Sequence, residues 1–190
     1  MYNELKTAQA AAYLIAREGG RMYHLKLMKL LYLSDRRSLE KYNNSISGDT
    51  YYSMKNGPVL SYTLDLINGD HRYNSLWKSW ITDKEDHQVG TTFVLSGEES
   101  LDQLEELSDN DLSILDEIYR QYGHYDRWAL VDLTHDPDII PEWSSPDHSC
   151  KPIDIRTLLT HLGKNEETIK FYLEREELER EVSGIIARNQ

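Results

Sequence analysis

The sequence predicts an α+β fold that is mainly α, with a helical core around one central buried helix at about residues 24–42 and a small antiparallel β element. Two observations lead to this class. The most apolar run of a polar chain, residues 25–36, contains no Gly or Pro and is too long for one strand. The runs that favour β-structure are short, whereas most of the remaining chain carries apolar residues at helical spacing.

Length, charge and cysteine content restrict the class of protein. A chain of 190 residues can form one compact domain, which we place at residues 1–150, followed by a C-terminal helical extension at 151–190. The net charge of −12 argues against generic nucleic-acid binding and favours basic partners. We find no membrane-spanning apolar run and no signal-peptide core after Met1, so we expect a cytoplasmic protein. The single cysteine, Cys150, excludes an internal disulfide framework.

The central helix contains one carboxylate that its pattern does not explain. On a helical wheel, Leu27, Met28, Leu30 and Leu31 share an apolar arc wide enough to contact neighbours on several sides. Asp35 lies in the middle of that arc, where an unpaired carboxylate is costly. Two interpretations stay open: a structural carboxylate bonded to a backbone amide or a tyrosine, or a functional carboxylate in a cleft.

The segments before residue 100 are expected to be two further helices and two β elements. An alanine-rich helix at 7–17 ends at Gly19-Gly20 and forms a helical hairpin with the central helix. A DNA-binding helix-turn-helix is the alternative, but its second helix would be exposed and basic. A strand at 50–55 leads to a turn, after which Pro58 is expected to open a helix to about Ile67. The runs 80–82 and 91–95 are expected to pair as a hairpin.

The second half of the sequence predicts four helices. The segment from Glu98 to Glu117 carries nine acids and no base, which indicates a solvated face or, alternatively, a docking surface for a basic partner. Ser108 is expected to cap a helix that ends at Gly123, and shorter helices follow at 126–133 and 153–162. Asn165 caps a long charged helix to about Ala187. Its expected apolar stripe consists of Ile169, Tyr172, Leu173, Leu178, Val182, Ile185 and Ile186.

The sequence shows no recognised catalytic apparatus. None of the seven histidines has a metal-ligand spacing, and there is no Gly-rich phosphate loop or nucleophile motif. His135, Asp136 and Asp138 are residue types common in turns, so we assign no metal site. We therefore expect no cofactor, and a binding module rather than an enzyme.

Four segments, in this order, resemble the SocA-like, or Panacea, antitoxin domain. The similarity runs from about Thr7 to Trp143, and its segments are 26–32 with Asp35 just beyond, Gly57-Pro58-Val59, 130–135 ending in Leu-Thr-His, and Pro141-Glu142-Trp143. The residues that carry the family pattern are Lys29, Tyr32, Asp35, Gly57, Pro58, Val59, Thr134, His135 and Trp143.

The resemblance implies a protein partner. Members of this family neutralise varied toxins by direct complex formation, one branch delivers its toxin to a protease as an adaptor, and the family occurs in prophages and mobile elements. The leading hypothesis is therefore an antitoxin. The alternatives are an enzyme that uses Asp35 and His135 in one pocket, and a DNA-binding regulator that uses the first two helices.

Two expectations about residues follow. If Asp35 is structural, its hydrogen-bond donors should come from the Gly57–Val59 turn, from Thr134 or His135, or from a nearby tyrosine. Toxin contact is expected outside the motif, at Val182, Ile185 and Ile186 near the end of the last helix. The alternatives for that helix are that it docks entirely on its own core or pairs with a second copy of the chain.

Overall fold

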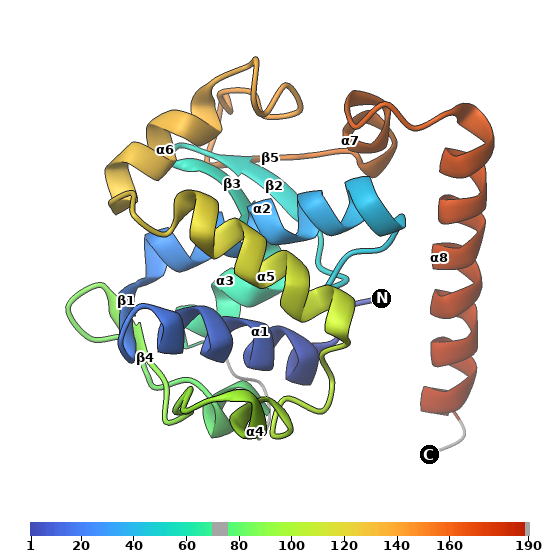
Figure 1. Ribbon diagram of the computed structural model, residues 1–190. Coiled ribbons are helices and arrows are strands. Elements are labelled where there is room, and N and C mark those ends of the chain that lie inside the picture. The colour runs from blue at the N-terminus through green and yellow to red at the C-terminus, as the bar shows by residue number, and fades with distance from the viewer. Residues whose placement is uncertain (70–75, 189–190) are drawn as a thin grey trace.

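One helix lies at the centre of the molecule, as predicted. The computed structural model describes residues 1–69 and 76–188. In it, α2 (His24–Tyr42) packs against α1 (Glu4–Arg17) and α5 (Asp109–Tyr122) (Figure 1). It also packs against β3 (Gly57–Leu60), an edge strand of a small sheet. The fold is α+β and mainly α, with the central helix at the predicted bounds.

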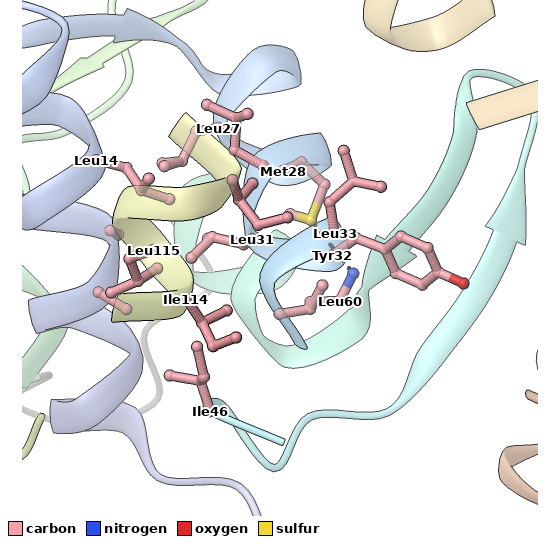
Figure 2. Packing of buried hydrophobic residues seen from close by; sticks show 14 of the residues in the cluster. Leu14, Leu27, Met28, Leu31, Tyr32, Leu33, Ile46, Leu60, Ile114 and Leu115 are labelled. Carbon is pink, nitrogen blue, oxygen red and sulfur yellow. Dashed lines mark hydrogen bonds between the residues drawn. The ribbon is translucent and has the colours of Figure 1, made fainter. Parts of the chain in front are cut away.

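The core forms on both sides of α2. Leu27 and Leu31 point toward Leu14 of α1 and Leu115 of α5, and all four side chains are buried (Figure 2). Tyr32 points the other way, toward the sheet, where its ring meets that of Tyr51 edge to face with centroids 5.6 Å apart. The wide apolar arc of α2 therefore packs against neighbouring elements on several sides.

A three-stranded antiparallel sheet covers the second side of α2. Its order is β3-β2-β5, formed by β3, β2 (Tyr51–Met54) and β5 (Cys150–Pro152). Tyr51 pairs with Leu60 across β2 and β3, and Ser53 pairs with Lys151 across β2 and β5. The expected boundary between domain and extension, after residue 150, lies within β5. The division into these two parts stays a prediction.

The expected helix from Pro58 is wrong in its first turn. Pro58 lies in β3, opposite Ser53. The helix α3 (Ser61–Ile67) begins three residues later. Pro58 has no N–H to donate, which is tolerated because β3 is an edge strand of the sheet. The carboxylate of Asp49 caps α3 instead, accepting from the backbone N–H groups of Tyr62 and Thr63 at 3.0 and 2.9 Å.

The expected hairpin of 80–82 with 91–95 is confirmed only in part. Ile81 and Thr91 form an antiparallel bridge. The backbone N–H of Thr82 donates to the carbonyl of Gly90 at 2.9 Å, and Glu85 bridges to Gln88. The expected strand at 92–95 does not form.

The strand in this region is β4 (Gln88–Gly90), and it pairs with β1 (Arg21–Tyr23), which precedes α2. Met22 and Val89 lie side by side on one buried face of this pair, and apolar cross-strand neighbours of this kind stabilise an antiparallel pair.

The four helices predicted in the second half of the sequence are present as α5, α6 (Arg127–His135), α7 (Ile155–His161) and α8 (Glu166–Arg188). Two short helices, η1 (Leu76–Ser79) and α4 (Glu98–Leu101), were not predicted. Ser108 caps α5 and forms a reciprocal capping box with Asp111. Asn165 accepts from the N–H of Thr168 at the start of α8, which runs down one side of the molecule (Figure 1).

The acidic segment is only partly a solvated face. Asp111 is buried and its carboxylate lies 2.8 Å from the ammonium of Lys6. Glu117 pairs with both Arg37 and Lys41 of α2. Six acids of the segment remain exposed: Glu98, Glu99, Asp102, Glu105, Glu106 and Asp109.

Candidate functional site

The first cluster of motif residues surrounds the buried ammonium of Lys29. This side chain is fully buried, and its Nζ donates to the carbonyl oxygen of Pro58 at 2.7 Å. Burial lowers the pKa of Lys29 to about 7, because water no longer solvates the charged form. The lysine therefore ties α2 to β3.

Gly57 and Thr134 close this cluster from two other elements. Gly57 has a φ of +95°, and a Cβ there would lie 2.6 Å from Oγ1 of Thr134 and 2.9 Å from Nζ of Lys29. The hydroxyl of Thr134 donates to the carbonyl of Leu130 within α6, at 2.9 Å. Gly57 is thus required both for its backbone conformation and for the absence of a side chain.

His135 and Trp143 stack beside the cluster. Their ring centroids are 4.0 Å apart, and the indole N–H of Trp143 donates to the carbonyl of Met54 at 3.2 Å. Burial, together with the charge of Lys29, holds the pKa of His135 below its usual range. The Nε2 atom of His135 has no hydrogen-bond partner among the described residues. The pair packs α6 and the 140–143 loop onto the β2–β3 turn.

A second cluster joins Tyr32 to Glu142, a buried glutamate that was not among the predicted site residues. The hydroxyl of Tyr32 and the Nε of Arg36 each donate to Oε1 of Glu142 at 2.7 Å. Burial and the neighbouring carboxylate raise the pKa of Tyr32 well above its usual value. Glu142 belongs to the Pro141-Glu142-Trp143 segment, but a single glutamate in a loop gives no sign in the sequence that it is buried.

The third cluster satisfies Asp35, which is buried as the structural interpretation expects. Its Oδ1 accepts from the backbone N–H groups of Ile46 and Ser47 at 2.8 and 2.9 Å. Its Oδ2 accepts from the hydroxyl of Tyr51 at 3.0 Å and from the hydroxyl of Ser47. Burial nevertheless raises the pKa of Asp35 to about 6, because desolvation outweighs these donors.

The donors expected for Asp35 are corrected in part. A tyrosine does bond to it, but the Gly57–Val59 turn, Thr134 and His135 belong to the Lys29 cluster instead. The reason is position along α2: Asp35 lies six residues after Lys29, about 9 Å farther along the axis, and faces the 45–51 loop. The structure therefore does not join Asp35 and His135 in one site, which removes the geometric basis of the enzyme hypothesis.

Two observations concern metal sites and membrane-spanning helices. In the described ranges, 1–69 and 76–188, no group of three or more His, Cys, Asp or Glu side chains could hold a metal ion. Within the same ranges, none of the helices combines the length and the apolar character that crossing a bilayer requires.

The apolar residues of α8 lie on two opposite sides of the helix, so the expected single stripe is wrong. Ile169 and Tyr172 are buried in the core, with Leu173 packed against it. At 100° per residue, four other apolar residues lie within about 60° of one another on the opposite side. These residues, which we call the outer seam, are Phe171, Leu178, Val182 and Ile185, with exposed fractions of 67, 60, 47 and 54%. The side chain of Ile186 lies outside the described residues.

A cleft of about 630 Å³ borders the outer seam at Leu178 and Val182. Its opposite wall contains Tyr2 and Leu5 near the N-terminus and also Leu76 of η1. The N-terminal amine holds this wall to α8 through ion pairs with Glu176 and Glu179 at 3.3 and 3.1 Å. The C-terminal half of α8 thus presents apolar side chains both outward and toward an open cleft.

Comparison with known protein families identifies the motif. The family model "Antitoxin SocA-like, Panacea domain" matches residues 27–143, which is more than half of the chain. The chain belongs to the SocA-like antitoxin family. Neither the curated proteins nor the solved structures yielded a match. The matched range of the SocA-like domain contains the Lys29 and Asp35 clusters and the Tyr32–Glu142–Arg36 group, whereas α8 and the outer seam lie beyond its end.

Proposed function

We propose that this protein is the antitoxin of a toxin–antitoxin pair and neutralises its cognate toxin in the cytoplasm by binding it directly. Membership of the SocA-like antitoxin family carries this proposal. The role is binding rather than catalysis, because the motif side chains are used inside the fold. Lys29, Asp35 and Glu142 are all buried, and each is bonded to a different element of the same domain.

Toxin contact lies outside these clusters in our proposal. A family that neutralises varied toxins needs a constant core and a variable surface. The end of α8 offers such a surface, with Val182 and Ile185 about half exposed. Ile186 belongs to the proposed contact by its position in the sequence. The exposed acids of the 98–109 segment provide a second region that suits a basic toxin.

Co-expression tests the function. The product of the adjacent reading frame is expressed with and without the tagged protein, and growth, complex formation and toxin lifetime are measured. We expect growth to recover and a stoichiometric complex to be isolated with the toxin lifetime unchanged, which is masking. Recovery with a shortened toxin lifetime that depends on a protease would identify an adaptor instead. Absence of both rescue and complex would refute the antitoxin proposal for this pair.

Removal of residues 177–190 tests the role of α8. The buried anchors Ile169 and Tyr172 remain in the truncated protein, so we expect its melting temperature to change little. Neutralisation should be lost if the end of α8 contacts the toxin. Full neutralisation by the folded truncation would place the contact elsewhere, and loss of folding would assign the segment to the core.

A further inference from the structure

The outer seam of α8 has the spacing of a coiled-coil surface. Phe171, Leu178 and Ile185 are seven residues apart, and Val182 follows Leu178 by four. From Leu178 to Ile185 this is the alternation of four and three residues by which one helix packs along another, and Arg175 takes the corresponding position between Phe171 and Leu178. The seam spans about 21 Å of helix at 1.5 Å per residue. Its narrow width distinguishes it from the broader stripe of a helix that docks on a globular core.

A row of acids runs beside the outer seam. Glu167, Glu174 and Glu181 are also seven residues apart, and all three are exposed. Lys170 lies 3.6 Å from Glu174, whereas Arg175 is directed to the body, where it donates to the carbonyl of Asn43. The flank of the seam is therefore mainly negative.

The acidic row argues against a second copy of this chain as the occupant. In an antiparallel pair of α8 helices, the acidic row would face itself. In a parallel pair, Glu174 would face Glu179 of the second copy. Like charges at these flanking positions oppose pairing, whereas opposite charges select a partner.

We propose that the outer seam binds one amphipathic helix of the toxin, with an apolar stripe flanked by lysine or arginine. The toxin as source of this helix rests on the proposed function. The apolar stripe covers Phe171, Leu178, Val182 and Ile185, and the basic flank pairs with the acidic row. The cleft beside Leu178 and Val182 accepts a side chain at the edge of the same helix.

Synthetic helical peptides test the surface without the toxin. Two peptides carry the same apolar heptad stripe, one flanked by Lys and the other by Glu, and titration measures their binding to the full chain. We expect the Lys peptide to bind at least about tenfold more tightly than the Glu peptide at low salt, with the difference shrinking at high salt. Equal binding of both peptides, or binding of neither, would overturn the proposal.

Paired variants locate the binding. Leu178→Gln with Val182→Gln keeps good helix formers in α8 and should weaken Lys-peptide binding at least about tenfold. The matched control, Val94→Gln with Ile139→Gln, removes two exposed apolar residues elsewhere and should have no effect. Glu174→Lys with Glu181→Lys should reverse the preference to the Glu peptide, whereas Asp132→Lys with Asp147→Lys, an equal charge change at exposed positions elsewhere, should not.

The same variants are then measured against the toxin and for self-association. If the wild type neutralises the toxin and the seam variants do so equally well, this inference fails while the antitoxin function stands. If the wild type binds no toxin, the proposed function fails, and with it the toxin as source of the helix. A wild-type dimer in sedimentation that becomes monomeric in the Leu178→Gln, Val182→Gln variant would assign the seam to a second copy and overturn the proposal.

Discussion

Gly57 and Thr134 approach so closely that a methyl group on Gly57 would lie 2.6 Å from Oγ1 of Thr134. The two residues come from different elements, β3 and α6, and the same methyl group would lie 2.9 Å from Nζ of Lys29. This contact is where the motif segments 26–32, 57–59 and 130–135 meet.

Gly57→Ala should destabilise the protein by about 3 kcal/mol. A left-handed backbone costs a side chain about 1–2 kcal/mol, and overpacking against Thr134 and Lys29 adds about 1–3 kcal/mol. The control is Gly19→Ala, because Gly19 has a similar φ of +101° but open space around it. Denaturant unfolding of both variants separates the two terms. Equal losses would contradict the proposed role of the contact.

Lys29→Met should abolish the increase in the free energy of unfolding that the wild type shows with rising pH. The pKa of Lys29 is lowered from 10.5 in the unfolded chain to about 7 in the fold, so the unfolded chain binds more protons between these values. Stability should therefore increase by about 2 kcal/mol from pH 7.5 to 9.5 in the wild type. Denaturant unfolding of Lys29→Met should show a flat profile, whereas Lys55→Met, which removes an exposed lysine nearby, should keep the wild-type slope. An unchanged slope in Lys29→Met would refute the assignment.

Asp35→Ala and Asp35→Asn should differ at pH 8, where the carboxylate is ionised. Alanine leaves the donors from Ile46, Ser47 and Tyr51 without an acceptor, with an expected cost of about 3 kcal/mol. Asparagine keeps one oxygen for the two backbone N–H groups, and the hydroxyls of Ser47 and Tyr51 can rotate to accept from its amide. Its cost should be about 1 kcal/mol.

Toxin neutralisation provides the second measurement on Asp35. Folded Asp35→Asn protein should neutralise as the wild type does, since the carboxylate has a structural role. Loss of neutralisation in Asp35→Asn with unchanged thermal stability would favour a functional carboxylate after all.

Glu142→Gln should destabilise the fold by about 2 kcal/mol, because Arg36 would lose the anion that it pairs with at a largely buried position. The control is Glu174→Gln, which breaks an exposed i,i+4 pair with Lys170 and should cost less than about 0.5 kcal/mol. Thermal unfolding at neutral pH compares the two. Similar small effects would mean that the Glu142 contacts contribute little.

Local sequence patterns predicted the long helices and the centre of the fold, but not the start of α3 or the short helices η1 and α4. These predictions used patterns that depend only on neighbours within a few residues. The patterns are the apolar arc of α2, the Ser108 cap of α5 and the Asn165 start of α8. The burial of Asp35 could also be predicted, because its place on the helical wheel follows from spacing alone.

The contacts between distant groups follow from the tertiary structure. The pairing of β1 with β4, the donors of Asp35 and the burial of Glu142 depend on contacts between residues far apart in the chain, which no local period encodes. The same holds for α8. Its two apolar sides have similar composition, but only the packing of Ile169 and Tyr172 on the core determines that the opposite side, the outer seam, faces solvent. Burial of one side by the body leaves the other available to a partner.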